Sequence, residues 1–529
     1  MCLHRRILTS GALVCGRLGV TLPTVVGEIS APVAAIDLGS NSFFMLLATL
    51  DHGQLAPVDK LRERVALATG LSSSQTLQPE AKARALACLA RFRERIQDLP
   101  SENCRAVGTK ALREAKNSQA FLEEAEKALG ARIEVISGRE EARLIYLGVS
   151  QAMGRADQRS LIIDIGGGST ECILGEGEST LLLDSLSMGC VTYSERYFPG
   201  GRIDDAALNR AELAAALELE GIASRYKAFG WKAALGTSGS MQAIESILLA
   251  EGWANGRGCI NLKGLRRLRK ALVAQGDMHK LKLKGLPQDR GPVLAGGLAI
   301  LLAIFDLFGL ESMQSSPAGL REGVALDLLG SGRRRNVREQ AVQSWLLRYR
   351  VDESQSLRVE RTAMKLFSQV AAAWKLDEES GQLLAWSARL HELGQAVAYS
   401  GYHKHGAYLI ANGELPGFSR EEQATLAALV RCHRRRFAAE RFADLPPRRR
   451  RRAMRLALLL RVAVALHRSR RDSEALEFRA HVGKGALMLE FDPGVLAAHP
   501  LTRAALDEVS PQPAPGKDNP TNLPLLIAH

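Results

Sequence analysis

A short pattern occurs twice in this chain, and the repeat limits what the chain can fold into. An apolar run ends in an aspartate, and an apolar residue, a glycine and small polar residues follow, first in "AIDLGSNSF" around Asp37 and again in "IIDIGGGST" around Asp164. Each copy predicts a strand, a tight turn and a second strand. Helical patterns follow both copies. We therefore expect two similar α/β lobes with a cleft between them.

The composition of the two turns suits phosphate. Glycine lets backbone N–H groups converge on an anion, and neighbouring hydroxyls add donors. Asp37 and Asp164 would repel phosphate by themselves, so their presence is explained if Mg²⁺ lies between carboxylate and phosphate. One such turn alone is more often an ordinary hairpin, but two matched turns and a third loop, "GTSGS" at 236–240, favour a phosphate site. The sequence has neither a GxxxxGK[ST] loop nor a GxGxxG between strand and helix.

Composition limits the class of protein. A chain of 529 residues with 46% hydrophobic content is too long for one core and predicts about three domains. The net charge of +13 favours a polyanionic partner, such as nucleic acid, anionic lipid or a phosphate polymer, although a codon bias toward arginine gives the same excess. Eight cysteines without CxxC pairs suit a reducing cytoplasm. The most apolar run, at 298–310, is too short to span a membrane and contains Asp306, so we expect a buried helix.

Changes in periodicity predict five segments. The first residues resemble a signal peptide only weakly, because Arg17 breaks the apolar stretch, and the last residues are rich in proline. The predicted segments are a disordered extension (1–31), a first α/β lobe (32–144), a second α/β lobe (145–330), an all-α domain (331–505) and a disordered tail (506–529).

Seven stretches together resemble the exopolyphosphatase and guanosine-pentaphosphate phosphohydrolase (Ppx/GppA) family. They are "AAIDLGSNSFFMLL", "VGTKALREAKN", "EVISGREEARLIYLGV", "LIIDIGGGSTE", "MGCVTYSERYFPGG", "LGTSGSMQA" and "LREGVALDLL". Their order and spacing match the family, and the likeness to long bacterial exopolyphosphatases extends over residues 32 to 500. The resemblance implies two lobes of the actin, Hsp70 and acetate kinase type, which are ribonuclease H-like, with a cleft between them.

The resemblance also assigns roles to residues. It implies Mg²⁺-dependent hydrolysis of a terminal phosphoanhydride, in which Glu141 of "GREEAR" activates or orients water and Arg113 of "ALREA" lies at the phosphates. Asp164 and Glu171 match the family's carboxylates on the metal side. The residues expected to bind phosphate are Asp37, Ser40, Asn41, Ser42, Gly166, Gly167, Gly168, Ser169, Thr170, Gly239 and Ser240. Glu140 should point away from the site, because adjacent helical residues do not share a face.

The helical tail resembles an HD-type phosphohydrolase fold with an altered metal-binding pair. His391 precedes Glu392 where that fold needs aspartate, and no upstream histidine ligand is evident, so we expect no second metal site. The tail histidines, expected at the surface, are His391, His403, His405 and His433. Arginines stand at 431, 434–436 and 448–452. A channel for a long polyphosphate chain would use them well, and a solvated or RNA-contacting surface is the plain alternative.

The function favoured by these patterns is an exopolyphosphatase that removes orthophosphate processively from inorganic polyphosphate. The alternative is a guanosine pentaphosphate 5'-phosphohydrolase, or both activities, because the same motifs serve both. The intact carboxylates argue against a non-catalytic binding protein, and the glycine pair at 296–297 lies in an apolar segment, which argues against a kinase. The family also implies a homodimer. We expect a cytoplasmic protein, with peripheral membrane association left open.

Overall fold

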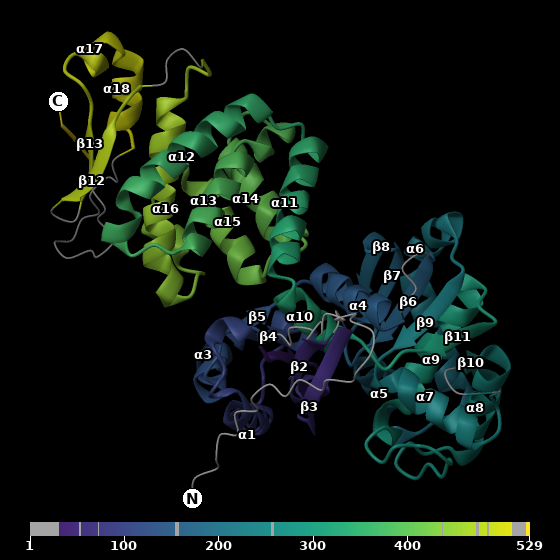
Figure 1. Cartoon of the computed structure of the whole chain (residues 1–529). Coiled ribbons are helices and arrows are strands. Elements are labelled where there is room, and N and C mark those ends of the chain that lie inside the picture. Colours follow the sequence, from purple (N-terminus) through teal and green to yellow (C-terminus); the bar gives the residue numbers. More distant parts are fainter. Residues whose placement is uncertain are drawn as a thin grey trace, which may run out of the picture.

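Two α/β lobes lie side by side, and a helical domain is set to one side of them (Figure 1). The computed structural model describes residues 31–51, 54–71, 74–153, 158–254, 256, 259–435, 437–471, 476–483, 486–509 and 525–528. All but the last residue of the predicted extension, 1–31, lies outside the described residues.

A five-stranded sheet in the order β3-β2-β1-β4-β5 forms the first lobe. Its strands are β1 (Val33–Leu38), β2 (Ser42–Asp51), β3 (Gln54–Arg64), β4 (Cys104–Gly108) and β5 (Ile133–Val135). β1 pairs antiparallel with β2 and parallel with β4. Alternate residues of β1 enter two different cores: Ile36 packs in a core with α1 (Pro79–Ile96) and α3 (Ser118–Leu129), whereas Ala35 packs on the opposite face. Asp37 follows the alternation of Ala35 and therefore faces the second lobe.

The second lobe repeats this plan in a six-stranded sheet of order β10-β11-β9-β6-β7-β8. Its strands are β6 (Ser160–Ile165), β7 (Thr170–Glu176), β8 (Ser179–Leu186), β9 (Ala233–Thr237), β10 (Cys259–Asn261) and β11 (Ser312–Ser315). Its helices are α5 (Cys190–Tyr197), α6 (Asp205–Phe229), α7 (Gly239–Ala250), α8 (Leu262–Gln275) and α9 (Gly291–Phe308). β6 pairs antiparallel with β7 and parallel with β9, just as β1 pairs with β2 and β4. The sequence repeat is thus a repeat of topology.

The apolar helix α9 belongs to the core of the second lobe. By length and composition it could cross a membrane, and 83% of its apolar window is buried inside the structure. Gly296 on this helix lies against α5, because a Cβ there would come within 2.6 Å of the Cys190 carbonyl oxygen. The glycine pair at 296–297 therefore serves helix packing.

Helices α4 (Gly138–Met153) and α10 (Leu320–Leu329) lie between the two sheets (Figure 1). They share one core with residues of β1, β2, β6 and β7. The predicted boundary between residues 144 and 145 therefore cuts through α4, and α10, placed by sequence in the second lobe, also packs against β1 and β2. The two helices approach closely, since a Cβ on Gly323 would lie 1.8 Å from the Leu144 carbonyl oxygen. Periodicity reports that a helix has an apolar face, but not which of two sheets covers it.

A buried ion-pair network fixes these two helices to β4. Arg105 binds Asp327 at 2.5 Å, and Arg143 donates to both Asp327 and Glu140 at 2.8 Å. Glu140 is fully buried and also accepts the N–H of Gly417 in the helical domain at 2.7 Å. As predicted, Glu140 points away from the cleft, and it joins the lobes to the helical domain.

The helical domain consists of six long helices around its own apolar core. They are α11 (Ser331–Arg348), α12 (Glu353–Trp374), α13 (Glu378–Leu390), α14 (Tyr402–Asn412), α15 (Arg420–Cys432) and α16 (Pro447–Leu466). A three-stranded sheet and two short helices follow: β12 (Arg479–Gly483), β13 (Ala486–Glu490), α17 (Val495–Ala498), α18 (Pro500–Asp507) and β14 (Leu525–Ala528).

The prediction of a disordered tail at 506–529 is wrong for its last described residues. Leu525–Ala528 pairs in parallel with β13. The proline-rich segment before it predicted disorder, but the apolar "LLIA" completes the small sheet by contributing main-chain hydrogen bonds and a buried Leu525.

The close crossing of α4 and α10 predicts a strong effect of Gly323→Ala. An added methyl group collides with backbone rather than with a movable side chain, so the free energy of unfolding should fall by at least about 2 kcal/mol. Urea unfolding followed by far-ultraviolet circular dichroism measures this. The matched control is Gly221→Ala in α6, where nothing lies within 4 Å, and stability should rise by up to about 1 kcal/mol. Equal stability of the two variants would contradict the close crossing.

Candidate active site

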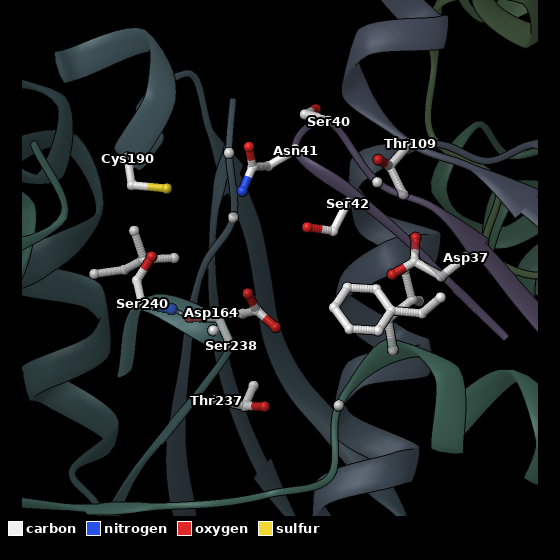
Figure 2. Close-up of a pocket in the computed structure, with 18 of the residues that line it drawn as sticks. Asp37, Ser40, Asn41, Ser42, Thr109, Asp164, Cys190, Thr237, Ser238 and Ser240 are labelled. Atoms are coloured by element: carbon white, nitrogen blue, oxygen red, sulfur yellow. Dashed lines mark hydrogen bonds between the residues drawn. The ribbon is translucent and has the colours of Figure 1, made fainter. Parts of the chain in front are cut away.

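The two repeated turns face each other across the interlobe cleft. Asp37 pairs with Phe44 and Val107 in its sheet, and Asp164 pairs with Glu171 and Thr237 at the equivalent position of the other. Both aspartates are the last but one residue of their strand, so the two turns begin at equivalent positions of the two sheets. Figure 2 shows side chains from both lobes directed into the pocket between them.

The turns are also in direct contact, which explains the glycines. A Cβ on Gly167 would lie 3.1 Å from Cβ of Ser40, and one on Gly168 would lie 3.5 Å from its Oγ. The N-terminus of α5 holds the second turn from behind, because the N–H groups of Cys190 and Val191 donate to the carbonyls of Gly166 and Gly167 at 2.9 Å. The carbonyls of the turn are thereby occupied, and a cradle for an anion is left facing the cleft.

The cleft contains a cavity of about 240 Å³. Twelve predicted residues line it: Asp37, Ser40, Asn41, Ser42, Glu141, Asp164, Gly166, Gly167, Gly168, Ser169, Gly239 and Ser240. Several of their polar atoms are buried without any hydrogen-bond partner, namely Asp37 Oδ1, Asn41 Nδ2, Ser42 Oγ and Ser240 Oγ. Buried polar atoms are rarely left unsatisfied, and their concentration here indicates a ligand site.

Three predicted site residues do not line the cavity. Thr170 points away and donates its hydroxyl to the Met188 carbonyl at 2.6 Å, so this hydroxyl does not face the cavity as the sequence predicted. Glu171 lies behind Asp164 and accepts the Ser185 hydroxyl at 2.8 Å. Arg113, expected at the phosphates, instead donates to Glu141 at 2.8 Å. Sequence spacing places these residues near the cleft but does not fix their side-chain directions.

Glu141 is held rigidly at the cavity wall. It lies in the first turn of α4, and Arg113, which binds it, also donates to the Ile136 carbonyl at 2.9 Å. Both side chains are nearly buried, at 8% and 10% exposed. A charge-assisted bond between buried groups fixes the direction of the Glu141 carboxylate, and one oxygen of a carboxylate so bound remains available to a ligand.

Burial and the charges of neighbouring carboxylates raise the pKa values of three acidic side chains in this region. Burial, followed by the charge of Glu141, raises the pKa of Asp37 to about 8 and that of Glu171 to about 8. Burial and then Glu171 raise the pKa of Asp164 well above its usual value. These directions show that negative charge here lacks compensation.

The oxygen-rich wall fits a hard cation such as Mg²⁺. Asp37 Oδ1 is buried without a partner, and the raised pKa values of Asp37 and Asp164 mark sites where a cation would relieve repulsion. Among the residues that the structure describes, no group of three or more His, Cys, Asp or Glu could hold a metal ion. Mg²⁺ commonly binds through one or two carboxylates, water and substrate phosphates rather than through an all-protein cage.

Sequence reasoning missed three arginines that line the cavity. The guanidinium groups of Arg62 and Arg321 both lie over the Phe44 ring, at 5.6 and 5.0 Å from its centroid. Arg290 is buried beside Gly239, where a Cβ would lie 2.0 Å from its guanidinium, and burial lowers its pKa. Arg321 stands inside the motif "LREGVALDLL" and could have been noticed. Arg290 lies in no motif.

The lobes, each presenting a turn to one shared cleft, define a protein of the actin-like class. Residues 46–332 match the Ppx/GppA phosphatase family, and residues 337–510 match Ppx/GppA phosphatase domain III. The chain belongs to the Ppx/GppA phosphatase family, which confirms the resemblance found in the sequence.

Curated relatives are similar along nearly the whole chain. The guanosine-5'-triphosphate,3'-diphosphate pyrophosphatase of Aeromonas hydrophila is 40% identical over 474 residues, which cover 89% of this chain and 95% of that protein. The protein of the same name from Pseudoalteromonas translucida is 39% identical over 482 residues, covering 91% and 96%. An exopolyphosphatase structure from Cytophaga hutchinsonii has a TM-score of 0.52 at 24% identity and covers 57% of this chain and 98% of its own, a likeness of fold alone.

The raised pKa of Asp37 predicts a pH-dependent effect of Asp37→Asn in the absence of divalent cations. Folded Asp37 keeps its proton up to about pH 8, whereas the unfolded chain loses it near its ordinary value of 3.8. The wild-type chain therefore loses stability between these pH values, and the variant lacks the part of this loss that Asp37 contributes. The free energy of unfolding of the variant should exceed the wild-type value by about 1 kcal/mol or more at pH 8 and converge with it near pH 4.

Urea titrations at several pH values with a chelator measure this difference. The control is Asp98→Asn, an exposed carboxylate, which should leave the pH profile unchanged. A gain for the Asp37 variant that is equal at all pH values would contradict burial of an uncompensated charge.

Proposed function

We propose that this protein hydrolyses the terminal phosphoanhydride of guanosine-5'-triphosphate,3'-diphosphate and releases orthophosphate from its 5' end. The observation that supports the reaction class is the Glu141 carboxylate, fixed by Arg113 at the wall of a cavity lined by two phosphate-sized turns. Support for the substrate comes from relatives with this substrate in their names, which are 38–40% identical over about nine tenths of the chain.

The structure also weakens the physical reason for preferring polyphosphate. Arg448 binds Glu126 of the first lobe at 2.6 Å and Glu421 of α15 at 2.9 Å. Other arginines of the run 448–452 bind Glu379 and Asp377 or donate to the carbonyls of Ala443 and Leu445. An arginine already paired with carboxylates in this way is less available to hold a polyanion. Exopolyphosphatase activity stays a second candidate, since it is a family-level property.

In the proposed complex, the 5'-phosphates lie in the cradle between the turns. Ser42 and Ser240 would donate hydroxyl hydrogen bonds, and Arg62, Arg290 and Arg321 would bind phosphate oxygens. Asp37 and Asp164 would hold Mg²⁺, which neutralises phosphate charge when it is bound. The contacting turns would exclude bulk water from the terminal phosphate and so strengthen each of these interactions.

Glu141 acts on the attacking water in this proposal. It accepts a hydrogen bond from the water and orients the oxygen in line with the phosphoanhydride bond. A new P–O bond forms as the bridging P–O bond breaks, the water proton passes to Glu141, and the nucleoside diphosphate end leaves with the bond's electron pair. Arg113 keeps the Glu141 carboxylate in position through this step.

Glu141→Gln should lower kcat for orthophosphate release by about 10² to 10⁴-fold, because an amide cannot accept the water proton. KM should change little, since Glu141 binds the water rather than the phosphates. A continuous phosphate-release assay measures both values. The control is Glu80→Gln on the first turn of α1, which removes a similar charge from an exposed helix start and should leave kcat unchanged. Wild-type kcat in the Glu141 variant would remove Glu141 from the mechanism.

The substrate proposal is tested with both candidates on one preparation. We expect kcat/KM for guanosine pentaphosphate to exceed that for long polyphosphate chains by at least about tenfold, a ratio that about 1.4 kcal/mol of transition-state binding supplies. Initial rates of phosphate release at matched Mg²⁺ give the comparison. If kcat/KM for polyphosphate is instead the larger by about tenfold, exopolyphosphatase activity, which the sequence first favoured, becomes the better assignment.

A further inference from the structure

The helical domain contains a cavity of its own, which shares no lining residue with the interlobe cleft. Its volume is about 710 Å³, within the range of cavities that bind small molecules. The ends of α13, α15, α16 and α18 meet around it. Aromatic side chains, among them Tyr402 and Phe437, form part of the wall, and two histidines and five arginines line it together with glutamine, acidic and small apolar residues.

Two buried histidines face this cavity with an unused nitrogen. Nδ1 of His391 lies 2.6 Å from the Ala388 carbonyl oxygen, and Nδ1 of His433 lies 2.6 Å from that of Val430. A carbonyl oxygen only accepts, so Nδ1 carries the hydrogen in both rings. Nε2 of each ring is then an acceptor in the neutral form. Both Nε2 atoms are buried without a hydrogen-bond partner, and Oε1 of Glu392 lies 4.0 Å from Nε2 of His391. Burial lowers the pKa of both rings, which favours that neutral form.

The histidines were expected at the surface, and the structure corrects this. His391 and His433 are 1% and 2% exposed, and His403 is also buried. Within the described part of the chain, these rings form no group of three or more ligands that could hold a metal ion. What the paired Nε2 atoms lack is therefore a hydrogen-bond donor, such as a hydroxyl or an amino group.

The charges around the cavity leave an excess of arginine. Each acidic side chain on the wall already has an arginine partner: Glu392 pairs with Arg470, Asp507 with Arg503 and Glu508 with Arg468. Three other wall arginines, Arg434, Arg435 and Arg461, form no ion pair with any described carboxylate. Arg461 is buried and donates to the carbonyls of Cys432 and Glu508 at 2.7 and 3.1 Å, while its Nε has no hydrogen-bond partner. Arg434 lies over the Tyr402 ring at 4.5 Å.

We propose that this cavity is a second binding site, for a nucleoside phosphate. Arg434, Arg435 and Arg461 bind the phosphate, and ribose hydroxyl or base amino groups donate to His391 and His433. Such a ligand carries both hydrogen-bond donors and negative charge. It therefore explains why histidine acceptors and arginine guanidinium groups line the same cavity. Inorganic phosphates carry the charge alone, and the two ligand classes can be told apart by experiment.

The test uses the full chain carrying Glu141→Gln, so that no nucleotide is consumed in the cleft. Equilibrium dialysis with labelled GDP, and separately with ADP, gives the number of sites per chain. We expect Arg434→Glu with Arg435→Glu to remove one site per chain for at least one of the two nucleotides. The matched control is Arg95→Glu with Arg451→Glu, which makes the same charge change at exposed positions outside the cavity and should remove none. The difference counts sites, so it does not depend on what the cleft binds.

A second arm tests the role of the histidines. His433→Phe, which removes the ring acceptor, should weaken nucleotide binding in the cavity by at least about tenfold and leave inorganic pyrophosphate binding unchanged. The proposal would be overturned if the Arg434/Arg435 variant and its control bind the same number of nucleotides per chain. The comparison extends to about 1 mM of each nucleotide. Equal affinities of pyrophosphate and nucleotide for the cavity would also overturn it, because the site would then recognise phosphate alone.

Discussion

The arrangement of this protein depends on one electrostatic constraint: buried carboxylates stand beside a cradle built for an anion. Asp37 and Asp164 occupy equivalent strand ends in two sheets, and Glu141 and Glu171 lie close enough to raise the pKa values of their neighbours. When these carboxyl groups are ionised, the wall repels phosphate unless positive charge is brought between them. Burial of these carboxyl groups therefore lowers the stability of the folded chain, although the proposed chemistry needs them. Such a conflict is common where charged groups serve catalysis.

The rest of the structure serves to hold that wall in place. Alternation along β1 directs Ile36 into one core and Asp37 toward the cleft, and the same register recurs in β6. α4 carries Glu141 on one side and Glu140 on the other. Because Glu140 binds Arg105, Arg143 and the N–H of Gly417, the helix that positions the candidate catalytic carboxylate is fixed to both the first lobe and the helical domain. A movement of the helical domain would thus displace Glu140, and with it the neighbouring Glu141 in the cleft.

Much of this could be predicted from the sequence, and the exceptions have physical causes. The duplicated turn predicted both lobes and nine of the residues that line the cavity, because two matched turns favour a binding site over an ordinary hairpin. Side-chain direction was less predictable: Thr170 turns to a carbonyl, and Arg113 binds Glu141 instead of facing the cavity. Arg290 reaches the cavity from a segment without a motif, and its position depends on Gly239 far along the chain. The strand at 525–528 depends on a partner strand, which local composition does not reveal.

We propose that the carboxylate wall and the bound phosphates require a shared divalent cation. The affinity of the Glu141→Gln chain for guanosine pentaphosphate, measured by calorimetry with Mg²⁺ and with a chelator in its place, tests this requirement. We expect binding at least about tenfold tighter with Mg²⁺, the equivalent of about 1.4 kcal/mol. Equal affinity in the two conditions would contradict it, because the arginines and the turns would then be sufficient to overcome the charge of the wall.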